Sequence, residues 1–127
     1  MPETIADRLR MAAARLRENF GRGRLVDHDG NQCALGAILD IRPPAVSQVA
    51  ALTGLLPAIY SDQIADGAVT ALHRHLVHMS EAGDMVRLSN DGFRIDAITT
   101  WNDTIVADGE EAAAVLEKAA ARWEERA

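Results

Sequence analysis

Apolar residues recur at helical spacing in three stretches of the chain. In the first stretch they fall within one arc of about 100°, which is the width of a stripe that faces a protein core. The other two stretches show the same spacing of three and four residues, which predicts amphipathic helices. The three stripes are Ile5, Leu9, Ala12, Ala13, Leu16 and Phe20; Ile64, Ala68, Leu72, Leu76 and Met79; and Ala112, Val115, Leu116, Ala119 and Trp123.

Capping residues stand where these three helices are predicted to begin. Thr4 with Asp7, and Asp108 with Glu111, have the spacing of capping boxes, and Asp62 offers a cap for the middle helix. Glycines mark the predicted ends of the first two helices, at positions 21 and 83.

Shorter elements are predicted between the first and second helices. Residues 25–32 are typical of an extended segment closed by an Asp-Gly turn, and residues 33–41 of a short buried helix. Pro43 and Pro44 end that helix, and we expect a further helix to begin at Ala45 and to end near Gly54.

The strongest β pattern lies between residues 85 and 95. Met85 to Leu88 and Phe93 to Ile95 flank a Ser-Asn-Asp-Gly turn, which predicts a β-hairpin. The fold class that follows is mainly α, a compact helical domain with one short β-hairpin. The length of 127 residues fits a single domain over residues 1–127.

The middle of the chain also has the order of a winged helix. Residues 46–55, the helix ending at Gly83 and the hairpin from Met85 to Ile95 correspond to a helix, a recognition helix and a wing. The stretch from Gly54 to Val69 is too long for the usual turn, and the recognition helix carries Arg74 as its single Lys or Arg. A winged-helix-like DNA-binding regulator is therefore the alternative to a protein-binding function.

The overall charge argues against general binding to nucleic acid. The chain carries a formal net charge of −6, so DNA is not an expected partner. Cys33 is the single cysteine and has no intrachain disulfide partner, and no apolar run has the length of a membrane span. We expect a cytoplasmic protein with no cofactor, and leave open whether it forms a homo-oligomer.

Arginines flank the apolar stripe of the first helix in two rows. One row is Arg8, Arg15 and Arg22, and the other is Arg10, Arg17 and Arg24. The row of Arg8, Arg15 and Arg22 is a candidate binding surface for an anionic partner. The alternative is that the arginines cover the edge of the core and pair with the acidic C-terminal helix, against which we expect the first helix to pack.

Cys33 and the histidines are candidates for catalytic or metal-binding groups. Cys33 begins a helix and lies five residues after His28, which is the basis for a cysteine-dependent hydrolase as a further alternative. Because Cys33 also leads a strongly apolar segment, we expect a buried structural thiol and no enzyme. His73 and His75 point about 200° apart on a helix, so we expect solvated or hydrogen-bonded histidines and no metal site.

Trp101, Asn102 and Asp103 form a candidate recognition motif. An aromatic ring beside an amide and a carboxylate suits a polar ligand. The alternative is structural, with Trp101 as a core anchor and its polar neighbours as caps of a short turn.

The chain resembles an uncharacterised family of small proteins from actinobacteria and their phages, a domain-of-unknown-function family. Four segments carry the resemblance: the Ala-rich first helix ending at Phe20-Gly21, the segment Cys33-Ala34-Leu35-Gly36-Ala37-Ile38, residues 68–76, and Ile98-Thr99-Thr100-Trp101-Asn102-Asp103. The chain departs from the pattern in being longer between Leu39 and Ala68 and in the hairpin at 85–95. The resemblance implies a shared origin and fold but no reaction. We therefore predict a non-enzymatic accessory or regulatory protein of actinobacterial or actinophage origin that acts by protein–protein interaction.

Overall fold

The described chain is mainly helical, and this confirms the predicted fold class. The computed structural model describes residues 3–41, 45–47, 62–79 and 94–126. Side chains from all five α-helices of these ranges meet in one apolar cluster. The elements are α1 (Ile5–Asn19), β1 (Arg24–Val26), α2 (Ala34–Leu39), β2 (Val46–Ser47), α4 (Gln63–Met79), α5 (Arg94–Thr100), the π-helix η4 (Trp101–Ile105) and α6 (Gly109–Glu125).

The capping box predicted at the start of α1 is confirmed. The Thr4 side-chain oxygen accepts a hydrogen bond from the amide of Asp7 at 3.0 Å, and the Asp7 carboxylate accepts one from the amide of Thr4 at 3.1 Å. The two hydrogen bonds lower the pKa of Asp7. This exchange satisfies two amides that the first turn of a helix leaves without partners.

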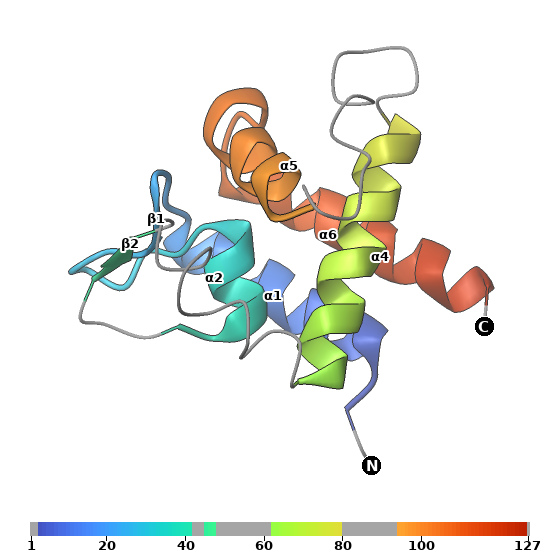
Figure 1. Ribbon diagram of the computed structural model, residues 1–127. Helices are drawn as coiled ribbons and strands as arrows, with labels where there is room; N and C mark the ends of the chain where they lie inside the picture. The colour runs from blue at the N-terminus through green and yellow to red at the C-terminus, as the bar shows by residue number, and fades with distance from the viewer. Residues whose placement is uncertain (1–2, 42–44, 48–61, 80–93, 127) are drawn as a thin grey trace.

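Helices α1 and α6 make the most extensive contact between elements, as predicted from their apolar stripes. Figure 1 shows α1 in blue beside α6 in orange-red, with α4 crossing α6. Gly109, the first residue of α6, lies so close to α1 that a Cβ atom there would stand 2.3 Å from the carbonyl oxygen of Leu16. The close approach lets the small alanines of both helices fill the interface.

Ion pairs join the outer edges of α1 and α6. Arg17 forms salt bridges with Glu110 and Glu117, and Arg10 forms one with Glu124. Hydrogen bonds from the arginines lower the pKa of Glu117 and of Glu124. The prediction that arginines of the first helix pair with the acidic C-terminal helix is thus confirmed for these two.

The segment before α2 has the predicted extended strand and tight turn. Gly30 adopts a φ of 87°, which glycine accepts at little cost, and its amide donates to the carbonyl of Asp27 at 3.2 Å. Cys33 then caps α2, with the amide of Gly36 donating to its sulfur at 3.4 Å. At Gly36 the backbones of α2 and β1 nearly touch, because a Cβ atom there would stand 1.9 Å from the oxygen of Leu25.

The prediction of a helix that begins at Ala45 is wrong at the start of that helix. Val46 and Ser47 form β2, which pairs antiparallel with β1 in the register Val26 to Val46 and Arg24 to Ser47. Because Val46 is β-branched and a partner strand is available, pairing prevails over the helical pattern. The rest of that predicted helix, to Gly54, lies outside the described residues.

The β-hairpin predicted between Met85 and Ile95 is wrong in its second strand. Arg94 and Ile95 begin α5, and the buried positions of this segment include Ile95, Ile98 and Trp101. Their spacing of three matches one face of a helix and not the alternation of a strand. The winged-helix-like middle section therefore lacks the second strand of its wing, and the strand predicted at residues 85–88 lies outside the described residues.

Candidate interaction surface

Two of the three arginines predicted to bind a partner are committed to salt bridges within the fold. Arg8 lies between the carboxylates of Glu3 and Asp62, at 2.8 and 3.6 Å. Arg15 pairs with Asp40, the C-cap residue of α2. These guanidinium groups hold α1 against neighbouring segments, so the row does not present free cations.

Arg22, the third of that row, binds backbone carbonyls. Its guanidinium donates to the carbonyl oxygen of Asn102 at 2.6 Å and to those of Val106 and Ala107 at 2.8 Å each. It also lies 4.9 Å from the centre of the Phe20 ring. Arg22 thereby fastens the chain after α1 to the segment between η4 and α6.

Asn102 of the Trp-Asn-Asp motif is fully buried, and its side-chain amide is occupied by the protein itself. Its oxygen accepts from the amide of Ala34 at 2.9 Å, and its nitrogen donates to the carbonyl of Gly21 at 3.1 Å. Its nitrogen also donates to the carboxylate of Asp103 at 2.9 Å, which accepts in turn from the amide of Gly23 at 3.0 Å. The polar atoms of Asn102 therefore join three segments of the chain.

Trp101 lies in the core, with 3% of its surface exposed. It opens the π-helix η4, whose wider turn carries both Trp101 and Asn102 inward. The structure brings the motif together around the end of α1, and it exposes neither of these two side chains to a ligand.

Cys33 and His28 lie in different environments. Cys33 is fully buried at the start of α2, whereas the His28 side chain is exposed. In the part of the chain that the structure describes, no group of three or more His, Cys, Asp or Glu side chains is arranged to hold a metal ion. No helix in these ranges is long and apolar enough to cross a bilayer.

A cluster of cations that the sequence pattern did not single out lies where α4 meets α6. Lys118 and Arg122 of α6 and Arg126, its C-cap residue, follow one another at intervals of four, which places them on one side of that helix. Arg74 of α4 lies over the ring of Trp123, with its guanidinium carbon 5.6 Å from the ring centre. We call the surface formed by Arg74, Lys118, Arg122, Trp123 and Arg126 the cationic face.

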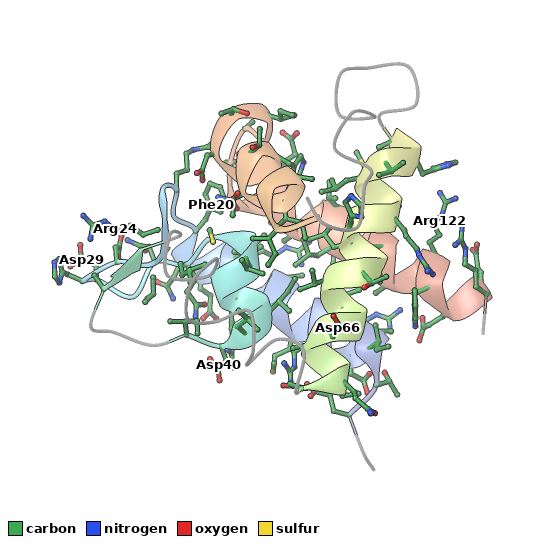
Figure 2. The ribbon with its side chains drawn as sticks, in the orientation of Figure 1. Phe20, Arg24, Asp29, Asp40, Asp66 and Arg122 are labelled. Carbon is green, nitrogen blue, oxygen red and sulfur yellow. The ribbon has the colours of Figure 1, made fainter. Side chains whose placement is uncertain are left out.

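A shallow hollow of about 10 Å³ opens on the cationic face. Its lining combines three arginines with Trp123 and two alanines, and the lining surface is mainly apolar. Figure 2 shows Arg122 beside α4 and α6, on the side of the molecule opposite Arg24 and Asp29. The lining residues are Ala71, Arg74, Ala119, Arg122, Trp123 and Arg126.

The four cations of this face make no salt bridge in the described structure, in contrast to the arginines of α1. The whole chain has a formal net charge of −6, so taking away these four positive charges leaves −10 for all other residues. Like charges gathered without counter-charges repel one another, and a bound anion relieves that repulsion. The cationic face is therefore a surface suited to an anionic partner.

His75 lies at the inner edge of this surface and is buried without a hydrogen-bond partner. Only 8% of the residue is exposed, and neither ring nitrogen has a partner among the described residues. Burial lowers its pKa from the usual 6.5, and the nearby cations Arg122, His78 and Lys118 lower it further. Of the two states expected for the histidines, solvated or hydrogen-bonded, His75 shows neither.

The buried His75 predicts a loss of stability on mild acidification. As the pH falls below about 6.5, the unfolded chain takes up a proton at this histidine while the folded protein resists it, so the free energy of unfolding decreases. We expect His75→Leu to be more stable than the wild type, by a margin that grows between pH 7.5 and pH 5. Urea denaturation at both pH values measures this.

His28→Gln is the matched control, because His28 is exposed in the turn after β1 and is not among the groups that lower the pKa of His75. It should keep the pH dependence of the wild type. An unchanged pH dependence in His75→Leu would contradict the assignment to His75.

The fold and the surface define the protein as a small helical domain with a cationic face on an otherwise acidic molecule. The chain belongs to a family of unknown function, DUF6197, whose model matches residues 1–122. Neither the curated proteins nor the solved structures include a significant match to the chain. The family match confirms the resemblance to a domain-of-unknown-function family, while the actinobacterial or phage origin and the diagnostic value of the two motifs stay predictions.

One weak signal of the cationic face is present in the sequence. Lys118, Arg122 and Arg126 have the i, i+4 spacing of one helix face. Glutamates lie between them in the sequence, so a count of charges over this segment does not show a cationic cluster. Arg74 is 44 residues earlier in the chain than Lys118. Only the crossing of α4 over α6 brings these residues together.

Proposed function

We propose that this protein is a non-enzymatic accessory protein that binds another protein through its cationic face. The observation that carries the proposal is the group of four cations around Trp123, without salt bridges in the described structure, on a molecule that is otherwise strongly acidic. An acidic segment of a partner protein is the complementary surface.

The composition of the face favours a protein partner. Arginine and tryptophan are the side chains that most often dominate the energy of protein–protein contacts. Trp123 is partly buried, which fixes its ring, and Arg74 lies over that ring. A long duplex would also meet the negative charge of the remaining surface, which disfavours nucleic acid.

The two alternative functions receive less support from the geometry. A winged helix needs a wing, and its predicted second strand is the start of α5. A hydrolase that uses Cys33 needs an accessible thiol, and Cys33 is fully buried.

Selection of peptides from a random displayed library tests the proposal even though the partner is unidentified. We expect peptides rich in Asp and Glu to be enriched on the wild-type protein, since they complement the face. Arg122→Glu should abolish this enrichment. Arg24→Glu is the matched control, because it makes the same change in charge at an exposed arginine on β1, remote from the face (Figure 2).

Three outcomes would overturn the proposal. Enrichment without any acidic preference, or equal enrichment on Arg122→Glu, would remove the cationic face as the binding surface. A gel-shift titration with duplex DNA completes the test: binding at physiological salt that Arg122→Glu abolishes would identify a nucleic-acid-binding protein instead.

A further inference from the structure

The hollow on the cationic face is shallow. Its volume of about 10 Å³ is close to the room that one water molecule needs. A phosphoryl group, a sugar or a nucleobase exceeds this volume. A ligand therefore lies across the mouth of the hollow and contacts the side chains around it.

Three arginines line this hollow. Arg74 and Arg122 line it from the two helices, and Arg126 lines it from the C-terminal end of α6. Each guanidinium carries five N–H donors in a planar fork that matches the oxygens of a carboxylate or phosphate. None of the three uses its side-chain donors on a hydrogen-bond acceptor within the described structure.

The number of arginines distinguishes between the two common anionic head groups. A carboxylate has one charge and two oxygens, which a single arginine satisfies with two hydrogen bonds. A phosphoryl monoester has a charge near −2 and three oxygens, so it can engage three guanidinium groups at once. Lys118 adds a fourth positive charge beside Arg122 on the same side of α6.

The apolar floor suits the stem that carries such a head group. Trp123 and the alanines at positions 71 and 119 form the uncharged part of the lining. A methylene group or an aromatic ring of a phosphorylated residue can pack on this surface while its phosphoryl group meets the arginines.

We infer that the cationic face around the hollow is a binding site for a phosphoryl monoester, presented by a phosphorylated side chain of the partner protein. This inference rests on the proposed function and narrows it, because it names the group that the cationic face recognises. Arg74, Arg122 and Arg126 bind the phosphoryl oxygens, and Trp123 contacts the stem.

NMR titration with small probes tests the inference separately from any partner. Phenyl phosphate carries a phosphoryl monoester on a ring, and benzoate carries a carboxylate on the same ring. At constant ionic strength we expect phenyl phosphate to shift the indole N–H signal of Trp123 saturably, with a Kd of about 1 mM. Benzoate should bind at least about tenfold more weakly. The indole signal of the buried Trp101 serves as an internal control.

Variants separate recognition from general attraction of anions. Arg122→Glu should abolish the shift, and Arg122→Lys should weaken binding about tenfold because it keeps the charge but loses the fork. Arg24→Glu should bind phenyl phosphate as the wild type does. Heteronuclear spectra of each variant show whether the fold is intact.

Four results would overturn the inference, and each differs from a failure of the proposed function. Equal shifts with benzoate, or no saturable shift at all, would reject a phosphoryl site while acidic peptides can still be selected on the face. Equal affinity for a phosphodiester such as dimethyl phosphate would point to a nucleic-acid backbone instead. Unchanged binding in Arg122→Glu would place the phosphoryl site elsewhere on the protein.

Discussion

Replacing Asn102 with alanine is expected to destabilise the protein by about 2 to 5 kcal/mol. The variant loses the acceptor for the buried amide of Ala34 and the donor for the carbonyl of Gly21. Each group left without a partner in a water-poor interior costs about 1 to 3 kcal/mol. Since small domains have about 5 to 15 kcal/mol in total, this is a large part of their stability. Chemical denaturation of the purified variant measures the change.

Thr104→Ala is the control for Asn102→Ala. Thr104 lies in the same π-helix and donates one hydrogen bond to the carbonyl of Thr100, but it is exposed, so water can replace its partner. We expect a change within about 1 kcal/mol. A small effect of Asn102→Ala would mean that the Asn102 network is not structural, and the hypothesis of a ligand at the Trp-Asn-Asp motif would regain support.

Gly36→Ala is expected to destabilise the protein by about 3 kcal/mol or more, although helix propensity predicts the opposite sign. In the middle of a helix alanine is favoured over glycine by about 1 kcal/mol. At this position the new methyl group would lie 1.9 Å from the carbonyl oxygen of Leu25 and 2.7 Å from its carbonyl carbon. Both are backbone atoms, so α2 and β1 would have to move apart. Thermal or urea unfolding measures the effect.

Gly67→Ala is the matched control for Gly36→Ala, since both glycines lie within helices. The methyl group at position 67 would meet only the end of the Ile5 side chain, at 2.3 Å, and this side chain can rotate. The gain in helix propensity then offsets much of the strain, and we expect a change within about 1 kcal/mol. Similar stability changes in the two variants would show that the contact between α2 and β1 is not rigid.

These two sites bear on the search for function within the family. Gly36 and the Trp-Asn-Asp motif lie in the segments that the sequence analysis predicted to carry the family resemblance, and in the structure both hold elements together. The proposed interaction surface lies on other residues, chiefly Arg74, Arg122 and Trp123. A sequence motif can therefore mark residues that hold the fold together, while the proposed binding residues lie elsewhere.

The long helices and their main contact follow from local features of the sequence. Examples are the caps at Thr4 and Asp108 and the apolar stripes of α1 and α6. These features are local, because the hydrogen bonds of a cap and the face of a helix involve residues only three or four positions apart. Each of these helices has one apolar stripe, and their flanks carry opposite charge. Packing the two helices against each other is the simplest way to bury both stripes.

The short elements and the candidate surface depend instead on packing between distant segments. Val46 and Arg94 have local patterns that fit more than one element, and the partner strand β1 and the core around Ile98 selected between them. The arginines of α1 and the cations of the cationic face look alike in sequence. Whether a charge is paired depends on which segment folds beside it. This distant packing placed Arg8 in salt bridges and left Arg122 without one among the described residues.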